Sequence, residues 1–436
     1  MLVKTTSVPP CGWNSYDSYG GFIDEKAAMA NLDVFAKRLA PFGYEYFVLD
    51  ACWYSDVTFM EWHRLKEQGK PRPMNLDEYG RFVTSPRKFP HGLRALSDAC
   101  HDRGVKFGVH VLRGVPAAAV ELNTPIKGHP TARARDIVDH DHGCGWQPFT
   151  LGIDMDAPGA QEYYDSVAEY LADDLQVDFI KLDDATDFPR EIEAFAKALD
   201  RQKRPIVLSL SPGGQNSPSQ WPVFSRYANM VRITRDIWDR DYELEQKFDR
   251  WQLFENVGGP ECWLDLDMIP IGGIQVHVPV DTPEECQPVL GCRRKSNLTE
   301  TGKRALMTQH ALAASPLIDG GDLVMSDDDD FALLTNAEVL ACNRNGRVAR
   351  QVFFGRHIDV RRVEESGRPG HGWIGVFLRD FFRKTPIDER LTSSELGFEK
   401  GLPPVLHDIW GNRELVREGD VLEVRLEPRG CLFIRY

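Results

Sequence analysis

Eight segments of this chain share one pattern: a run rich in β-branched and aromatic residues ends in polar side chains and leads towards a helical stretch. Such units, joined by right-handed crossovers, build a parallel sheet, and eight of them close it into a barrel. We therefore predict an α/β fold, a (β/α)8 TIM barrel over residues 1–335. The predicted strands are residues 12–16, 43–53, 104–113, 177–185, 205–211, 230–234, 262–268 and 315–319. The helical stretches include residues 25–39, 93–103, 161–175, 191–199 and 303–314.

The pattern changes after about residue 335. Short β-rich runs separated by Gly, Pro and Asn follow at residues 352–354, 357–360, 373–378, 405–410 and 421–426. They predict an antiparallel β-sandwich domain over residues 336–436. A chain of 436 residues is too long for one ordinary core, and a barrel followed by one smaller domain accounts for that length.

Composition restricts the partners and the compartment. The chain has 66 Asp and Glu against 52 Lys and Arg, a formal charge of -14, which argues against nucleic acid or an anionic membrane surface as a partner. The first residues lack the apolar core of a signal peptide, so we expect a cytoplasmic protein, with a trimmed secreted form left open. Nine scattered cysteines, an odd number, favour reduced thiols over a disulfide scaffold. The sequence leaves open whether the chain forms a homo-oligomer.

Polar and aromatic side chains gather where the predicted strands end, which is the rim that carries catalysis in a barrel of this type. A phosphate site would call for a Gly-rich loop before a helix, and residues 211–214 match that pattern weakly. Carboxylates with aromatic rings suit a polyol better, because carboxylates accept hydroxyl hydrogen bonds and rings pack on sugar faces. The rim residues are Trp13, Tyr16, Asp50, Trp53, His110, Arg113, Lys181, Asp183, Asp184, Ser209, Ser211, Arg232, Asp236, Asp265 and Asp267.

Two carboxylates across an open site are what glycoside hydrolysis needs. Asp183 lies two residues from Lys181 on the same face of its strand, which favours the ionised form required of a nucleophile. Asp236 follows another strand, beside Ile237 and Trp238, where partial burial would suit a general acid. Asp184 is the rival nucleophile, although the pleat aims it away from the side of Lys181.

Five motifs resemble, in order, those of glycoside hydrolase family 27, the α-galactosidase and α-N-acetylgalactosaminidase family of the melibiase clan. They are PCGWNSY (10–16), LDACW (49–53), FIKLD (179–183), MVRITRDI (230–237) and WLDLDM (263–268), within a resemblance that runs from residue 9 to about 343. The resemblance implies a retaining mechanism and a C-terminal β domain. It also implies Asp183 as nucleophile, Asp236 as acid/base, and sugar contacts from Asp50, Lys181, Arg232 and Asp267. Retention predicts that the two catalytic carboxyls lie about 5 to 5.5 Å apart.

Departures from the family pattern bear on the substrate. Ala51 stands where the family usually has a second aspartate, which removes a contact on the side of the galactose 4- and 6-hydroxyls. His110 and Tyr16 stand where Tyr and Trp are usual. Ser211 and Gly214 replace the bulky pair of α-galactosidases and resemble the α-N-acetylgalactosaminidase pattern, which leaves room for a 2-substituent.

We therefore predict a retaining exo-α-glycosidase that removes terminal α-galactosyl, α-N-acetylgalactosaminyl or related residues. It would act on a small carbohydrate and use neither a metal nor an organic cofactor. Asp183 and Asp236 are the predicted catalytic residues. The predicted substrate contacts are Trp13, Tyr16, Asp50, His110, Arg113, Lys181, Ser211, Arg232 and Asp267. For Arg113, neutralisation of the acidic rim is an open alternative.

Two other functions stay open. Lys181, if burial lowers its pKa, could form a Schiff base as in an aldolase-type lyase. The barrel could also bind carbohydrate without turning it over. In the loop around residues 139–146, His140, His142 and Cys144 lack a fourth zinc ligand at the usual spacing. We expect this loop at the rim, with Trp146 either as a sugar platform or as a packed residue.

Overall fold

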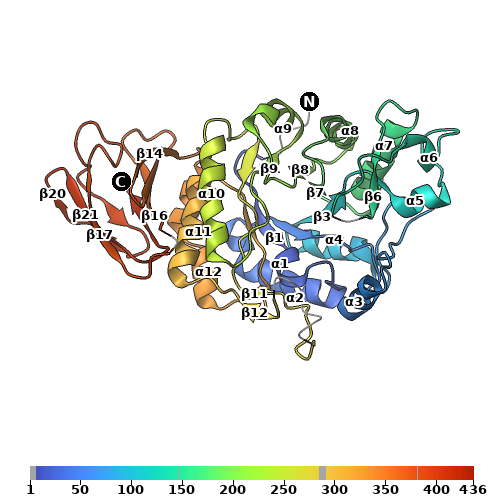
Figure 1. The fold of residues 1–436 in the computed structure, drawn as a ribbon, viewed down its shortest axis with the longest axis horizontal. Coiled ribbons are helices and arrows are strands. Elements are labelled where there is room, and N and C mark those ends of the chain that lie inside the picture. Colours follow the sequence, from blue (N-terminus) through green and yellow to red (C-terminus); the bar gives the residue numbers. More distant parts are fainter. Residues whose placement is uncertain (1–5, 147, 284–290, 381) are drawn as a thin grey trace.

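The computed structural model describes residues 6–146, 148–283, 291–380 and 382–436. Its centre is a parallel sheet of eight strands in the order β10-β9-β8-β7-β3-β2-β1-β13 (Figure 1). Each strand overlaps one of the eight predicted runs, because a strand buried on both faces needs a nearly continuous apolar sequence. The strands are β1 (Cys11–Asn14), β2 (Tyr46–Leu49), β3 (Lys106–Leu112), β7 (Phe179–Asp183), β8 (Val207–Leu210), β9 (Met230–Arg232), β10 (Trp263–Asp265) and β13 (Leu317–Asp319).

The sheet closes because the chain just past β10 pairs with β13. Ile269 forms a parallel bridge with Asp319. The Ile269 N–H donates to the Ile318 carbonyl at 2.8 Å, and the Gly320 N–H donates to the Ile269 carbonyl at 2.9 Å. This closure confirms the predicted barrel and places the carboxyl ends of all eight strands on one rim.

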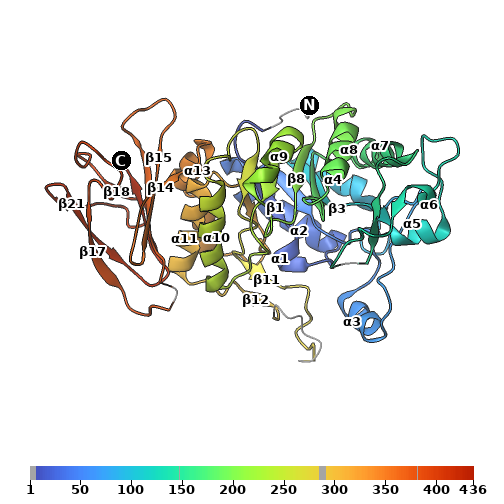
Figure 2. The ribbon, with the colours of Figure 1, turned by 45° about the horizontal axis from the view of Figure 1, so that its top comes forward.

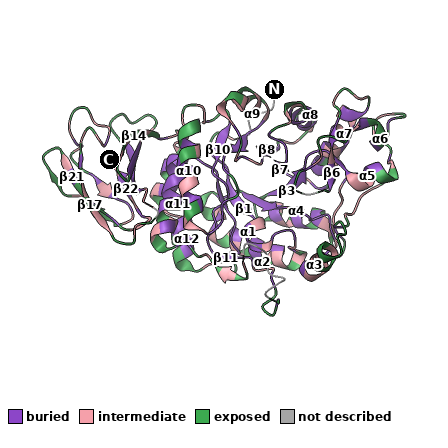
Figure 3. Ribbon diagram, viewed as in Figure 1, coloured by how far each residue is buried: buried purple, intermediate pink, exposed green. Residues whose placement is uncertain are grey.

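Helices surround the barrel (Figures 1 and 2). Their buried faces turn towards the strands and their exposed faces towards solvent (Figure 3). Asp24 caps α2 by accepting the Ala27 N–H, and Thr299 caps α11 by accepting the Gly302 N–H. The helices of this layer are α2 (Glu25–Arg38), α4 (Gly92–Asp102), α7 (Ala160–Glu169) with a π-helical turn (Tyr170–Asp174), α8 (Pro189–Asp200), α9 (Trp221–Tyr227), α10 (Asp241–Phe254) and α11 (Glu300–Leu312).

Alternate residues of each strand face the barrel interior, so the interior can be read along the strands. One end is filled by an apolar cluster that contains Tyr46, Val48, Phe179, Val207, Met230 and Trp263. Further along the same strands and in phase with that cluster come Asp50, Lys181, Asp183, Ser209, Arg232 and Asp265. The barrel is therefore apolar at its amino end and polar at its carboxyl rim.

Excursions from the strand ends build walls around this rim. The longest leaves β3 and forms a small antiparallel sheet in the order β4-β6-β5. These elements were not predicted from the sequence, because they are short and carry little periodic pattern. They are α1 (Tyr16–Tyr19), α3 (Phe59–Glu67), β4 (Val115–Pro116), α5 (Ala117–Leu122), α6 (Ala134–Ile137), β5 (Val138–Asp139), β6 (Thr150–Ile153), β11 (Gly273–Ile274) and β12 (Arg294–Lys295).

The C-terminal part is an antiparallel β-sandwich, as predicted. A sheet in the order β14-β15-β16-β22-β18-β19 faces a smaller sheet in the order β17-β21-β20, with a separate apolar core between them. Helices α12 (Asp328–Leu334) and α13 (Ala337–Arg344) precede it, and the domain boundary at residue 335 stays a prediction. The strands are β14 (Arg350–Gly355), β15 (Ile358–Glu364), β16 (Gly372–Leu378), β17 (Ile387–Thr392), β18 (His407–Asp408), β19 (Arg413–Glu414), β20 (Arg417–Glu418), β21 (Val421–Leu426) and β22 (Cys431–Arg435).

The sandwich packs against the barrel on the side of α10 and α11 (Figure 1). Phe248 of α10 meets Phe377 of β16 with ring centroids 5.0 Å apart. Arg361 of β15 lies over the ring of Trp251. Within the described ranges, no helix has the length and hydropathy to cross a membrane.

Candidate active site

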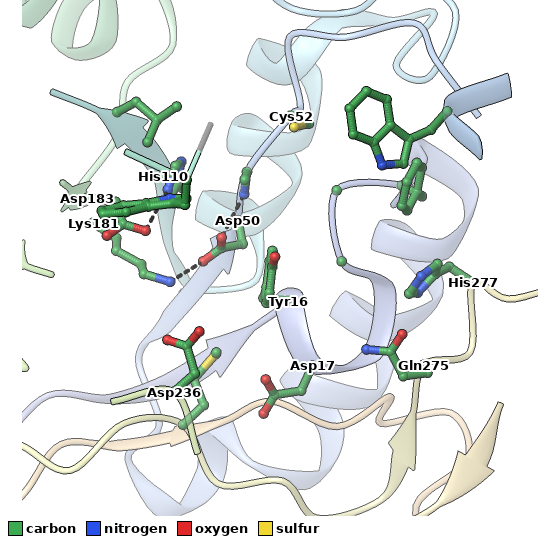
Figure 4. Close-up of a pocket in the computed structure, with 18 of the residues that line it drawn as sticks. Tyr16, Asp17, Asp50, Cys52, His110, Lys181, Asp183, Asp236, Gln275 and His277 are labelled. Carbon is green, nitrogen blue, oxygen red and sulfur yellow. Dashed lines mark hydrogen bonds and ion pairs between the residues drawn. The ribbon is translucent and has the colours of Figure 1, made fainter. Parts of the chain in front are cut away.

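A cavity of about 530 Å³ opens at the carboxyl rim of the barrel (Figure 4). Both predicted catalytic aspartates border it, although they come from strand ends more than fifty residues apart in sequence. The predicted residues that line the cavity are Tyr16, Asp50, His110, Lys181, Asp183, Arg232, Asp236 and Asp267.

Asp183 ends β7 and is held by hydrogen bonds on both oxygens. Its Oδ1 accepts the Ser211 hydroxyl at 2.8 Å, and its Oδ2 lies 3.4 Å from Nε2 of His110. Burial alone would raise the pKa of Asp183, but the His110 hydrogen bond and the charges of Lys181 and Arg232 outweigh burial and hold the pKa well below its usual range. The carboxylate is therefore ionised and oriented, as a nucleophile must be.

Ser211 occupies a different place from the one predicted for it. It is buried and orients Asp183 through its hydroxyl, and it is not one of the residues that line the cavity. Its neighbour Pro212 supplies that part of the wall.

Lys181 and Asp50 form an ion pair beside Asp183, the predicted nucleophile. Lys181 Nζ donates to Asp50 Oδ2 at 2.8 Å, and the Asn14 amide donates to the same oxygen at 2.8 Å (Figure 4). Burial would lower the pKa of Lys181, but the carboxylates of Asp50 and Asp183 outweigh burial and raise it. A Schiff-base lysine needs the opposite shift, so the electrostatics of this site argue against the lyase hypothesis.

Arg232 connects the second catalytic candidate to the barrel. Its Nη1 lies 2.8 Å from Asp236 Oδ1 and 3.3 Å from Asp267 Oδ1. Asp267 Oδ2 accepts the Ile237 N–H at 2.7 Å, which fixes the turn that carries Asp236. The partial burial expected for Asp236 is not found, because its side chain is 68 % exposed and Ile237 and Trp238 turn into the protein instead.

Trp13 was predicted to contact substrate, and the structure contradicts this. Its ring is fully buried, stacks on Phe47 at 4.5 Å and donates its indole N–H to the Gly321 carbonyl at 2.6 Å. Its neighbour Asn14 is the residue that reaches the rim. Trp13 is one position out of phase with the inward face of β1 and faces the helical layer.

The predicted substrate contact of Arg113 is wrong for the same reason, since Arg113 also lies one position out of phase with the inward face of its strand. It follows Leu112, which lines the cavity, and points outward, where it pairs with Asp184 at 2.7 Å and Glu191 at 2.6 Å. Arg113 is buried and contacts no part of the cavity. It neutralises two carboxylates behind the rim, the alternative left open by the sequence.

Asp184 is excluded as the nucleophile by the same arrangement. Its backbone is left-handed, with φ +61°, and its carboxylate turns away from Asp183 towards Arg113. Burial raises the pKa of Asp184 to about 6 despite the Arg113 charge. Two consecutive aspartates thus face different surroundings.

Several cavity residues come from the excursions and were not predicted. They carry no periodic signal, since each lies in a loop or a short helix whose position depends on tertiary packing. They include Asp17, Phe22, Phe59, Trp62, Met268, Gln275 and His277.

The loop around residues 139–146 borders the rim as expected. Trp146 lines the cavity and is half exposed, which suits a sugar platform better than a packed residue. His142 lies 2.7 Å from Asp139. Among the residues that the structure describes, no three His, Cys, Asp or Glu side chains stand together as a metal site would require.

Known proteins resemble this chain along its length, although no family model matches it. An α-galactosidase from Cyamopsis tetragonoloba is 26 % identical over 97 % of this chain and 84 % of its own length. α-Galactosidase A from Cellvibrio japonicus is 25 % identical over 79 % of this chain and 69 % of its own length. The solved structure of a family 27 β-L-arabinopyranosidase from Geobacillus stearothermophilus, in complex with arabinose, is 33 % identical with a TM-score of 0.88. It covers 99 % of this chain and 97 % of its own.

The likeness to the arabinopyranosidase covers both the barrel and the sandwich. Its sequence identity of 33 % supports membership of one family, beyond a shared fold. The predicted family is confirmed: the chain is a glycoside hydrolase and belongs to glycoside hydrolase family 27.

Proposed function

We propose that this chain is a retaining exo-glycosidase that removes a terminal galacto-configured sugar by double displacement. The observation that supports it most directly is the state of Asp183, an ionised carboxylate held on both oxygens in the cavity that Asp236 also lines. Inverting enzymes instead need space for a water molecule between the two carboxyls.

In the first step a carboxylate oxygen of Asp183 attacks the anomeric carbon and forms a glycosyl ester. The glycosidic bond breaks as Asp236 gives its proton to the departing oxygen. In the second step Asp236, now a carboxylate, takes a proton from water, whose oxygen attacks the anomeric carbon and releases Asp183. Two inversions restore the original configuration.

The neighbours of the nucleophile suit the binding of sugar hydroxyls. Lys181, Asp50, Arg232 and Asp267 present charged donors and acceptors around it, and charge-assisted hydrogen bonds are the stronger kind. Terminal α-galactosyl and α-N-acetylgalactosaminyl groups are the substrates proposed from the family motifs.

Ala51 favours a second candidate substrate, a β-L-arabinopyranoside. It lines the cavity with a methyl group where the family usually has a carboxylate. β-L-Arabinopyranose has the ring configuration of α-D-galactose without the hydroxymethyl group, so it needs no partner at that position. The 33 % identical arabinopyranosidase from Geobacillus stearothermophilus acts on that sugar by its name.

A panel of nitrophenyl glycosides tests the proposal: α-galactoside, α-N-acetylgalactosaminide, β-L-arabinopyranoside and, as control, α-glucoside. We expect turnover of at least one of the first three. Proton NMR of the first product should show the anomeric configuration of the substrate. An inverted product would contradict the retaining mechanism, and turnover of the glucoside alone would contradict the galacto-configured site.

A further inference from the structure

Two buried cations lie at one wall of the cavity without a carboxylate to balance them. Arg72 is 7 % exposed and Lys88 is 8 % exposed, and both come from the segment between α3 and α4. Within the described ranges their side chains donate to hydroxyl and carbonyl oxygens and form no ion pair. A buried charge normally has a charged partner, because removing it from water unpaired costs several kcal/mol. Two such charges together therefore point to an anion that the chain itself does not supply.

The carbonyl of Gly21 holds the two cations next to each other. Nη2 of Arg72 and Nζ of Lys88 both donate to this oxygen, each at 2.8 Å. Lys88 Nζ also donates to the Cys52 carbonyl at 3.1 Å. Burial, and then the charge of Arg72, lowers the pKa of Lys88 to about 7. The two positive charges thus oppose each other, and neutral carbonyls cannot compensate for that.

The nearest carboxylates are engaged elsewhere. Asp56 Oδ1 accepts the Ser85 hydroxyl at 2.5 Å and the Asn75 amide at 3.0 Å. Asp24 accepts the backbone N–H that begins α2. Both lie close enough to influence Lys88, but neither is paired with it.

Arg72 offers a free nitrogen to the cavity. Its Nε donates to the Ser55 hydroxyl at 3.2 Å and its Nη2 to the carbonyls of Gly21 and Val57, but Nη1 forms no hydrogen bond to a described residue. Arg72, Gly21 and Cys52 all line the cavity. A Cβ added to Gly21 would lie 2.9 Å from Nη1 and 3.2 Å from the Cys52 sulfur. The missing side chain of Gly21 therefore lets the guanidinium approach the cavity beside Cys52.

This nitrogen lies at the end of the cavity away from the scissile bond. Cys52 follows Ala51 in sequence, and Figure 4 shows Cys52 on the far side of Asp50 from Asp236. In the proposed function the anomeric carbon lies at the two catalytic aspartates, and Ala51 lies at the hydroxymethyl position of the sugar. A group attached at C6 would therefore extend towards Cys52 and the guanidinium.

The surroundings of this end also favour a negative charge. An aspartate at position 51 would repel an anion here, and Ala51 removes that repulsion. Lys66 of α3 lines the cavity from an exposed position and forms no ion pair in the described part of the chain. Asp17 is the acidic residue on this side of Tyr16, and burial raises its pKa, which favours the uncharged form.

Resting on the proposed function, we propose that the sugar removed by this enzyme carries an anionic group at C6, bound by the Arg72 guanidinium above Gly21 with Lys88 behind it. Carboxylate, phosphate and sulfate oxygens all accept charge-assisted hydrogen bonds from a guanidinium. A uronic acid has this charge on C6 itself, whereas a 6-phosphate or 6-sulfate has it on an ester of the hydroxymethyl group. The substrate class is thus an acidic, galacto-configured glycoside.

Four nitrophenyl glycosides with one ring configuration test the proposal: α-galactoside, α-galacturonide, α-galactoside 6-sulfate and α-galactoside 6-phosphate. We expect kcat/KM for one of the three acidic substrates to exceed that for the neutral galactoside about tenfold or more, and the preferred one distinguishes a carboxylate from an ester. Arg72→Gln should lower this ratio of acidic to neutral kcat/KM about tenfold, because one charge-assisted hydrogen bond is lost. Using the ratio cancels a general loss of folded enzyme. Arg425→Gln, at an exposed arginine of β21, is the matched control.

A second pair of variants leaves Arg72 and its structural hydrogen bonds in place. Ala51→Asp adds a carboxylate next to the anion and should lower the same ratio about tenfold by repulsion. Ala51→Asn adds similar bulk without charge and should lower the ratio less. A ratio near one in the unaltered chain would overturn the anionic subsite, and so would a ratio that neither Arg72→Gln nor Ala51→Asp changes. Hydrolysis of neutral glycosides would in either case leave the proposed function standing.

A binding measurement separates the subsite from the hydrolytic proposal. Calorimetry with galactose, galacturonate, galactose 6-sulfate and galactose 6-phosphate requires no turnover. One acidic sugar should bind about tenfold tighter than galactose, and Arg72→Gln should remove the difference. If the unaltered chain hydrolyses none of the glycosides but this difference is found, the function fails and the subsite stands. If galactose and the acidic sugars bind equally, the subsite fails.

Discussion

His110 Nε2 lies 3.4 Å from Asp183 Oδ2, across two adjacent parallel strands in which His110 and Lys181 face each other in register. Because an ionised carboxylate only accepts hydrogen bonds, the proton of a neutral His110 ring lies on Nε2, and the buried Nδ1 has no hydrogen-bond partner among the described residues. Asp183, the proposed nucleophile, is thus held by a ring N–H on one oxygen and by the Ser211 hydroxyl on the other, while the Lys181 ammonium pairs with Asp50.

Replacing this donor should shift the acid limb of activity. In His110→Phe the ring volume remains but the hydrogen bond that lowers the pKa of Asp183 is lost, so this pKa rises. Because only the carboxylate attacks, activity should then disappear at a higher pH as the medium is acidified. We expect kcat/KM to fall about tenfold or more at neutral pH. The pH profile of kcat/KM between about pH 2.5 and 8 measures the shift, and an unchanged acid limb would argue against a role for His110.

Asp183→Ala should abolish turnover almost completely. Without an attacking oxygen kcat should fall by several orders of magnitude, and azide or formate should restore part of it by entering the space left by the carboxylate. Steady-state kinetics with and without azide provide the measurement, and thermal unfolding controls for folding. Activity that survives the substitution would show that another group is the nucleophile.

Asp236→Ala should be selective for the leaving group. A nitrophenolate departs with little protonation, whereas a sugar alkoxide needs a proton. The loss in kcat should therefore be much larger for a disaccharide than for a nitrophenyl glycoside. Asp239→Asn is unsuitable as a control because Asp239 is buried and binds Arg294, so Asp388, whose pair with Arg425 is exposed to solvent, serves instead. Equal losses on both substrates would remove Asp236 from the acid role.

Ala51→Asp tests the specificity proposal. The new carboxylate would face the cavity next to Asp50 and could accept a hydrogen bond from a 6-hydroxyl, which galactose has and arabinopyranose lacks. We expect kcat/KM for the nitrophenyl α-galactoside to rise about tenfold relative to the β-L-arabinopyranoside. Ala51→Asn controls for size. An unchanged ratio of the two rates would mean that residue 51 does not face the hydroxymethyl position.

Asp17 should also affect stability in a pH-dependent way. Burial, then the Asp267 charge, raises the pKa of Asp17 well above its usual value. The folded chain therefore keeps a proton that the unfolded chain releases above about pH 4, and the free energy of unfolding falls as pH rises from there through the folded pKa.

Asp17→Asn removes this dependence. Its melting temperature should exceed that of the unaltered chain by about 2 °C or more at pH 7.5, and by less at pH 4.5. Circular dichroism melts at both pH values measure the difference. A stability gain that is the same at both pH values would indicate that the Asp17 carboxyl does not change protonation on folding.

The barrel could be predicted because every strand is buried on both faces. Its sequence is therefore an apolar run that ends in polar residues at the rim. The sandwich followed from short runs between turns, although β17, β19, β20 and β22 were missed. β17 alternates exposed and half-buried residues, Ile387 to Thr392, and so has little apolar signal. The small sheet β4-β6-β5 was also missed, since its strands of two to four residues depend on tertiary packing.

The candidate site divides in the same way. Side chains at strand ends, such as Asp50 and Lys181, could be located because strand direction decides which rim they reach. The predicted substrate contacts of Trp13 and Arg113 were wrong because a shift of one residue along a strand moves a side chain to the other face. Asp17 and Gln275 could not be predicted, because their loops are positioned by contacts with distant segments.

The left-handed turn at Asp184 has a consequence for how the enzyme tolerates change. Because Asp184 has φ +61°, its carboxylate points towards Arg113, whereas the carboxylate of its neighbour Asp183 borders the cavity. Through Arg113, Asp184 anchors the wall around residues 113–153. A substitution that changes the backbone conformation at this turn would displace both Asp183 and Arg113. Substitution of Asp184 would therefore disturb Asp183 as well, even though the Asp184 carboxylate points towards Arg113.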